Sequence, residues 1–234
     1  MSIQLAVTQN QDGRRPTGPM HRSIVALDLE GSTNRTNPVK AELRRVLYEL
    51  LYRALDAAGV EEKNLDQLTD RGDGVLVLIR PDDDVPKTVL LGRLIPALAV
   101  LLTEHNAAVI QPALAIRLRA VVHAGEVHQD DNGFFGEDLD VAFRLLDSRT
   151  VKKALKKTIA PLVLVISEEI FRGIVRHRYT DEGPYEPLVR VRVANRQRRG
   201  WIHVPSPLPA GAPEISRPQV LLPPPHPART VLWR

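Results

Sequence analysis

The sequence contains no cysteine, few aromatic residues and no long apolar run. Without cysteine the chain can form neither a disulfide nor a thiolate metal site, which fits a reducing compartment. No apolar stretch reaches the roughly 18 residues that a membrane span needs, and residues 1–20 lack the apolar centre of a signal peptide. The sequence therefore predicts a cytoplasmic protein with no membrane partner.

Positive charge is in slight excess and is dispersed in short clusters. The formal net charge is +4, and the excess lies at Lys152–Lys153, at Lys156–Lys157 and within 196–199. Clusters this short are typical of a solvated surface. Aromatic residues, on which nucleic-acid bases stack, make up only 4% of the chain. A nucleic-acid partner is therefore not expected.

The 234 residues suit one domain flanked by termini of different composition. Residues 1–21 are polar and are predicted to be flexible, and residues 22–204 are predicted to form the folded domain. Residues 205–234 form a proline-rich tail that includes Pro223-Pro224-Pro225. Such a tail can be a ligand for the aromatic groove of a partner, but a linker or a non-globular end is the favoured interpretation.

The apolar pattern of the first half of the domain predicts alternating strands and helices. Pro38 opens a helix whose apolar residues recur at helical spacing up to Gly59. A second helix contains Pro96, which is expected to kink or split it. The order is a strand at 23–29, the first helix, strands at 65–69 and 75–79 joined as a hairpin, a helix at 85–104 and a strand at 115–123. This β-α-β-β-α-β order predicts an α+β class with a ferredoxin-like core, in which two helices cover one face of an antiparallel sheet.

Additional helices and strands are expected on the C-terminal side of this core. They are a hairpin or loop at 126–136, a helix at about 139–146, a strand at 162–166, a helix from Ser167 and a strand pair at 188–194 and 200–204. Ser167 is a good helix N-cap because two glutamates follow it. His123 and His128 are interpreted as structural or exposed residues rather than as metal ligands.

Two acidic turns, 45 residues apart (28 to 73), carry most of the functional information. They are Leu27-Asp28-Leu29-Glu30-Gly31-Ser32-Thr33 and Asp70-Arg71-Gly72-Asp73-Gly74, and each follows an apolar run typical of a strand. Taken singly, Asp28 could merely cap the next helix, and Asp-Gly is ordinary hairpin chemistry. In the predicted core, however, the first strand and the hairpin are neighbours, so Asp28 and Asp73 approach one another. Two carboxylates at neighbouring strand ends can hold Mg²⁺ against a nucleoside triphosphate.

Five segments, in the same order along the chain, resemble motifs of the class III nucleotidyl cyclases, the adenylate and guanylate cyclase family. The segment 25–33 is similar to the family's first metal-binding strand and phosphate loop, and Gly72-Asp73-Gly74 to its second metal site. The other three are 119–127, 136–145 and 165–169, which are similar to the family's Arg-x-Gly-x-His-x-Gly-Glu-Val strand, its segment ending in Ala-Ala-Arg-Leu, and its Val-Ser-Glu. The resemblance covers residues 22–204.

The resemblance implies a lyase that converts a nucleoside triphosphate into a 3′,5′-cyclic monophosphate and pyrophosphate. Two Mg²⁺ or Mn²⁺ ions would be held by Asp28 and Asp73, with the Leu29 carbonyl as a further ligand. The backbone of Glu30-Gly31-Ser32-Thr33 would bind phosphate oxygens.

Two residues of the segment 136–145 would complete this site. Arg144 would balance the charge that develops on the α-phosphate in the transition state, and Asp140 stands where the family has a ribose-orienting Asn. In the family the metal-binding pair comes from one subunit and the Arg from the other. A head-to-tail homodimer with catalysis at its interface is therefore implied.

The two positions that read the purine base in the family differ here. They are Thr69, where the family has a Lys or Glu, and Gly133, and neither offers a clear hydrogen-bonding set for a purine edge. Asp140 adds a negative charge next to a polyanionic substrate. One interpretation is a different base, UTP or CTP, as in the pyrimidine cyclases of bacterial antiphage signalling.

Two other interpretations stay open. The chain could be a catalytically weak or inactive relative that acts as a nucleotide-binding or regulatory interaction domain. Polymerase palm domains and diguanylate cyclases also place two carboxylates on such a core, but the sequence has no Gly-Gly-Asp-Glu-Phe-like turn. Asp28, Asp73 and Arg144 together favour the active cyclase.

Overall fold

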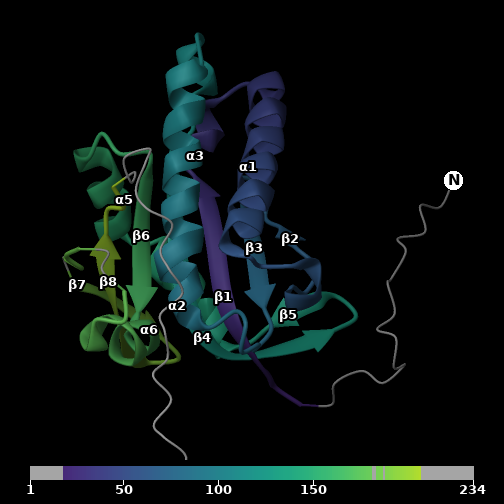
Figure 1. Cartoon of the computed structure of the whole chain (residues 1–234), viewed down its shortest axis with the longest axis vertical. Helices are drawn as coiled ribbons and strands as arrows, with labels where there is room; N and C mark the ends of the chain where they lie inside the picture. The colour runs from purple at the N-terminus through teal and green to yellow at the C-terminus, as the bar shows by residue number, and fades with distance from the viewer. Residues whose placement is uncertain (1–17, 181–182, 187, 207–234) are drawn as a thin grey trace, which may run out of the picture.

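The computed structural model describes residues 18–180, 183–186 and 188–206 (Figure 1). Strand β1 begins at Met20, two residues before the predicted start of the domain. Most of the predicted flexible N-terminal segment and of the proline-rich tail, residues 1–17 and 207–234, lies outside the described residues.

The predicted β-α-β-β-α-β core is confirmed. Its elements are β1 (Met20–Leu29), α1 (Asn37–Ala58), β2 (Thr69–Asp70), β3 (Gly74–Ile79), α2 (Lys87–Val89), α3 (Ile95–Ala108) and β4 (Leu118–Asp130). Strand β1 pairs antiparallel with both β3 and β4 and so lies between them. Short 3₁₀ turns at Ser32–Asn34, Glu62–Asn64, Pro112–Leu114 and Val175–His177 join or follow these elements.

The C-terminal elements extend the same sheet. They are β5 (Gly133–Phe135), α4 (Glu137–Leu146), α5 (Arg149–Lys157), β6 (Leu162–Ser167), α6 (Glu168–Gly173), β7 (Leu188–Val193) and β8 (Arg196–His203). The strand order is β2-β3-β1-β4-β6-β8-β7, with β5 added to β4, and the one parallel pair of the described sheet is β4 with β6. The sequence predicted each of these elements except α5.

The sheet separates two apolar layers. Helices α1 and α3 lie side by side along one face of it (Figure 1), where Leu47, Leu51 and Leu98 pack against Val25 and Val77. On the other face α4 and α5 bury their apolar residues against β4, β6, β7 and β8. This second layer holds α4, the helix that carries Asp140 and Arg144, against the sheet.

Pro96 was expected to kink or split the second core helix, and it does not split it. The helix is continuous over Lys87–Ala108, because a π-helical turn at Leu90–Leu94 precedes the proline. The wider turn accommodates a residue that has no N–H and whose ring would crowd the preceding turn.

The same helix is the one described segment that is long and apolar enough to cross a membrane. No such segment was expected from the sequence, where charged residues interrupt its apolar run. In the fold, however, Leu90, Leu94, Leu98 and Leu102 are buried in the apolar layer that α1 and α3 form with the sheet. Packing of this kind is typical of a core helix.

Strand β2 is shorter than the predicted 65–69. Only Thr69 and Asp70 pair with β3, apart from an isolated bridge between Leu65 and Ile79. Before the strand, the Asp66 N–H donates to the Leu78 carbonyl at 2.9 Å, and its buried carboxylate accepts hydrogen bonds from Arg22 and Arg80.

The basic clusters predicted to be solvated surface lie in helix α5 and strand β8. Lys152–Lys157 lies in α5, which places Val151 and Leu155 against the sheet and its lysines outward. In β8, Arg198 pairs with Glu137 of α4 and Arg199 with Glu168 of α6.

Candidate active site

Asp28 stands near the end of β1, at the centre of one edge of the sheet. Its register partners are Gly74 of β3 and Arg119 of β4. Position 74 must be glycine because a Cβ there would collide with the Leu27 carbonyl oxygen. This close approach of β3 to β1 brings the β2–β3 turn next to Asp28.

Asp73 lies on that turn and is tied directly to β1. Its carbonyl oxygen accepts a hydrogen bond from the Leu29 N–H at 2.9 Å. Its carboxylate accepts one from the Ser32 hydroxyl at 2.5 Å. Burial raises the pKa of Asp28, Arg119 opposes this rise, and the negative charge of Asp73 adds to it. The two carboxylates therefore lie close enough to interact, as the two acidic turns predicted.

Arg119 is the first residue of this site to which the sequence assigned no role. Its guanidinium forms an ion pair with the Asp28 carboxylate, and both side chains are mostly buried. Its Nε is buried without a hydrogen-bond acceptor among the described residues. Arg119 therefore balances the charge of Asp28, and its Nε–H remains as a donor without a described acceptor next to this carboxylate. The sequence could not have shown that Arg119 lies beside Asp28, because this depends on the register between β4 and β1.

Arg44 is the second such residue, and it reaches the acidic turn from α1. Its guanidinium binds both carboxylate oxygens of Asp70 and also the Gly72 carbonyl. Asp70 in turn accepts a hydrogen bond from the Gly72 N–H at 2.7 Å. The bond from Arg44 lowers the pKa of Asp70 to about 2. Asp70 thus shapes the turn, which leaves Asp73 as the carboxylate directed to the site.

Arg44→Ala is expected to lower turnover about ten- to a hundredfold, because residues that orient metal ligands have effects of this size. The cause would be a displaced Asp73 rather than an unfolded domain, since Arg44 is on the surface. The measurement is kcat/KM as a function of Mn²⁺ concentration. Arg45→Ala is the matched control, because Arg45 is also on α1 but its described ion-pair partners are Glu42 and Glu49 of the same helix. Equal activity in the two variants would contradict the role of Arg44.

The predicted phosphate loop forms the turn after β1. Gly31 adopts a left-handed conformation (φ 70°) and starts a 3₁₀ turn at Ser32–Asn34. The Glu30 N–H is not free for a ligand, because it donates to the Arg117 carbonyl at 2.9 Å. The backbone N–H groups of Gly31, Ser32 and Thr33 have no acceptor among the described residues. These three are the donors that a phosphate could use.

The carboxylate pair is compatible with a divalent cation that is also held by phosphates. The described residues contain no group of three or more His, Asp or Glu side chains placed to hold a metal. A Mg²⁺ ion in a nucleotide site commonly takes one or two carboxylates and completes its shell with water and substrate phosphates. Asp28, Asp73 and a backbone carbonyl at Leu29 fit this donor set.

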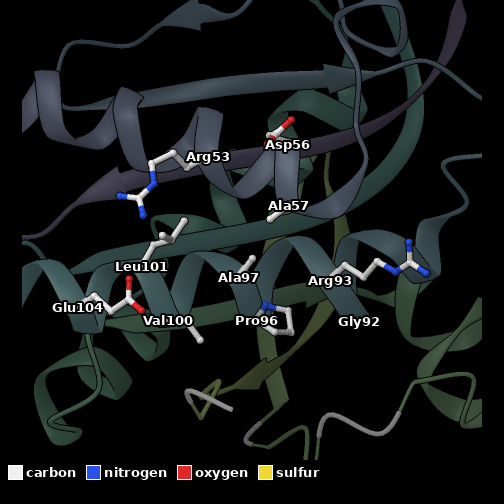
Figure 2. A pocket seen from close by; sticks show the side chains of 10 residues that line it. All are labelled: Arg53, Asp56, Ala57, Gly92, Arg93, Pro96, Ala97, Val100, Leu101 and Glu104. Atoms are coloured by element: carbon white, nitrogen blue, oxygen red, sulfur yellow. The ribbon is translucent and has the colours of Figure 1, made fainter. Parts of the chain in front are cut away.

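A groove of about 590 Å³ runs between α1 and α3, on the layer that covers the sheet (Figure 2). Its apolar floor includes Ala97 and Leu101, and charged side chains such as Arg53 and Glu104 border it. This groove lies on the helical layer and contains none of the predicted site residues.

No protein-family model and no curated protein matches the chain. Solved structures do match. They include an adenylate/guanylate cyclase/hydrolase from Silicibacter pomeroyi (TM-score 0.56, 18% identity, 81% of this chain and 99% of that chain) and the guanylyl cyclase Cya2 (0.54, 17%, 80% and 92%). A third is the guanylate cyclase domain of RhGC from Catenaria anguillulae in complex with GTP (0.52, 13%, 80% and 98%).

The chain has the fold of the adenylyl and guanylyl cyclase catalytic domains. At identities of 13% to 18% this likeness establishes the fold, and the roles of single residues depend on the geometry above.

On the cyclase fold, the predicted residues of α4 make no described side-chain contact with the carboxylate pair. Asp140 and Arg144 are exposed, and among the described residues neither makes a side-chain hydrogen bond or ion pair. Arg71 of the acidic turn stacks on Phe143, one residue before Arg144, at 3.7 Å from the ring centroid. Helix α4 is thus anchored near the turn while Arg144 faces outward.

The two predicted base-reading residues lie on different hairpins. Thr69 is in β2 opposite Leu76, and its hydroxyl makes no hydrogen bond with a described residue. Gly133 begins β5, where its N–H donates to Asp130 at 3.0 Å. The structure therefore adds no hydrogen-bonding side chain to either position.

Proposed function

We propose that this chain is a nucleotide cyclase, converting a nucleoside triphosphate to a 3′,5′-cyclic monophosphate and pyrophosphate. The observation that carries the proposal is that Asp28 and Asp73 lie close together at one edge of the sheet of a cyclase fold. The backbone N–H groups of Gly31, Ser32 and Thr33, which have no described acceptor, lie on the turn that follows Asp28. Each of these groups suits a triphosphate with its metal ions.

In the proposed reaction Asp28 and Asp73 would hold two Mg²⁺ or Mn²⁺ ions, with the Leu29 carbonyl as a further ligand. When bound, the ions would activate the 3′-hydroxyl and neutralise charge on the triphosphate and the leaving pyrophosphate. Ser32 keeps the Asp73 carboxylate in place, and Arg119 balances the charge of Asp28. The N–H groups of the 31–33 turn bind phosphate oxygens.

The proposal includes a homodimer with the site at its interface. Arg144 is exposed and free of described partners, and no contact ties it to the carboxylates of its own chain. An Arg144 supplied by a second copy would stabilise charge that develops on the α-phosphate, and Asp140 would accept from a ribose hydroxyl. The site is then incomplete without the partner.

A pyrimidine substrate, UTP or CTP, is the finer part of the proposal. Thr69 and Gly133 offer no side chain able to read a purine edge by two hydrogen bonds. A role in antiphage signalling is proposed only as an extension of this base preference.

The same two residues also favour the second candidate, a weak or inactive relative that binds nucleotide without turning it over.

The test is incubation of the purified protein with ATP, GTP, CTP and UTP separately, in Mn²⁺, with products identified by mass. We expect one cyclic pyrimidine monophosphate together with pyrophosphate. A cyclic purine product would keep the cyclase and overturn the base assignment. No product from any of the four, with the dimer intact, would favour the second candidate.

A further inference from the structure

His123 of β4 is a fully buried titratable residue with no role in the proposed chemistry. It lies on the face of the sheet that α4 covers, and carboxylates from two helices flank its ring. Its Nε2 faces Asp138 of α4 at 3.3 Å, and its Nδ1 faces the Ser167 hydroxyl at 2.8 Å and Glu169 of α6 at 3.4 Å. These four residues are called the His123 cluster below.

Asp138 fastens the first turn of α4 to β4 by a second contact. Its other carboxylate oxygen accepts a hydrogen bond from the Glu126 N–H at 2.6 Å. This approach requires glycine at position 125, because a Cβ there would overlap the Asp138 carboxylate. Asp138 thus bridges a strand N–H and a buried imidazole.

Apart from Asp138, α4 is held by buried apolar contacts and by two contacts at the surface, the Arg198–Glu137 ion pair and the stacking of Arg71 on Phe143. Leu139, Ala142 and Leu145 are buried, and a Cβ on Gly200 of β8 would lie 2.8 Å from the Leu145 side chain. Apolar packing is non-directional and permits a helix to shift along its axis. The His123 cluster adds directional contacts to a fully buried ring and to a strand N–H, at the first turn of the helix.

We propose that His123 is a positioning residue that fixes helix α4 on the sheet and so sets where Asp140 and Arg144 stand. The consequence for turnover rests on the proposed cyclase function, whereas the anchoring of α4 does not. The role differs from the structural or exposed one expected from the sequence, because it acts through the helix that carries the proposed catalytic Arg.

The charge state of the cluster determines how the anchoring depends on pH. Burial lowers the pKa of His123, but hydrogen bonds to Asp138 and Glu169 more than offset this, so its pKa is raised. The bond to His123 lowers the pKa of Asp138, and the pKa of Glu169 is lowered to about 2 despite burial, by its bonds to His123, its own backbone and Ser167. Ser167 faces the ring from β6 and is neutral.

The signs of these shifts define a pH window. The raised pKa of His123 stabilises the fold fully below the unfolded value of about 6.5, and this contribution is lost as pH rises through the folded value. The lowered pKa values of Asp138 and Glu169 contribute above about 4 and are lost as pH falls towards 2. The anchoring of α4 is therefore strongest between about pH 4.5 and 6.5 and weakens in alkali.

The experiment compares His123→Gln with wild type by amide hydrogen exchange. Glutamine retains a hydrogen-bonding group but carries no charge. We expect exchange in α4 (Glu137–Leu146) to rise about tenfold or more relative to α1. We also expect wild-type α4 protection, corrected for intrinsic rates, to decline from pH 6 to pH 9, and the variant to lose this dependence. His105→Gln on α3 is the matched control and should leave α4 unchanged.

Two outcomes would overturn the proposal. One is α4 exchange that is unchanged relative to α1 in His123→Gln. The other is loosened α4 with an unchanged kcat, since a positioning residue should lower kcat about tenfold while KM changes little. If His123→Gln does not fold, Asp138→Asn gives the same comparison from the helix side. If wild type makes no cyclic product, the cyclase proposal fails, and the exchange data still decide whether His123 anchors α4.

Discussion

Asp73→Asn and Asp28→Asn are each expected to lower kcat/KM by at least about a thousandfold while the domain stays folded. An amide is nearly isosteric with a carboxylate but carries no charge, so the site loses most of its attraction for divalent ions. Asp73→Asn is the cleaner variant, because the described partner of its carboxylate is the neutral Ser32 hydroxyl. Asp28→Asn also leaves Arg119 without its ion-pair partner in a mostly buried setting.

The measurement is cyclic-product formation at saturating Mn²⁺, together with a thermal unfolding midpoint. Asp83→Asn, in the exposed loop after β3, is the control for the loss of one negative charge. A midpoint within a few degrees of wild type would attribute the loss to the site rather than to the fold. Full activity in either carboxylate variant would refute the two-metal assignment.

Mixing two inactive variants, Asp73→Asn and Arg144→Ala, is expected to restore activity. If each site takes its carboxylates from one subunit and its Arg from the other, a mixed dimer contains one site with both groups intact. Random exchange of subunits gives about half mixed dimers, each with one intact site of two. Activity should therefore return to about a quarter of wild type.

The control is the mixture of Asp73→Asn with Asp28→Asn, which leaves no intact site in any dimer and should remain inactive. The assay is repeated after co-expression, in case the subunits exchange slowly. A mixture of Asp73→Asn and Arg144→Ala that stays inactive, with mixed dimers demonstrated by mass, would place Arg144 outside the shared site. The homodimer arrangement would then have to be abandoned.

The sequence predicted most of the fold because its signals are local. Pro38 and Gly59 delimit α1, and Ser167 caps α6 through the Ile170 N–H, as expected. Helix α5 was not predicted because it is short and only two of its residues are buried. Its four lysines were therefore interpreted as solvated surface. Pro96 indicated an irregularity in the second core helix, but the apolar pattern did not specify that it would be a π-helical turn at Leu90–Leu94.

Some residues of the candidate site could likewise be found from the local sequence, and others could not. Asp28 and Asp73 could be found because each is the acidic residue of a turn that follows an apolar strand. Arg119, Arg44 and His123 acquire partners 91, 26 and 15 or more residues away in sequence. Their contacts depend on register and helix position, which the sequence did not specify by any spacing.

The sequence by itself thus determined the order of strands and helices, and it placed two carboxylates at neighbouring strand ends. Strand and helix periodicity and turn chemistry act over a few residues, so they can be read along the chain. Only the tertiary structure decided that Arg119 neutralises Asp28, that Arg44 shapes the turn of Asp73, and that His123 lies between Asp138 and Glu169. Burial is the physical reason, because it determines which charges must find a partner and which partner is within reach.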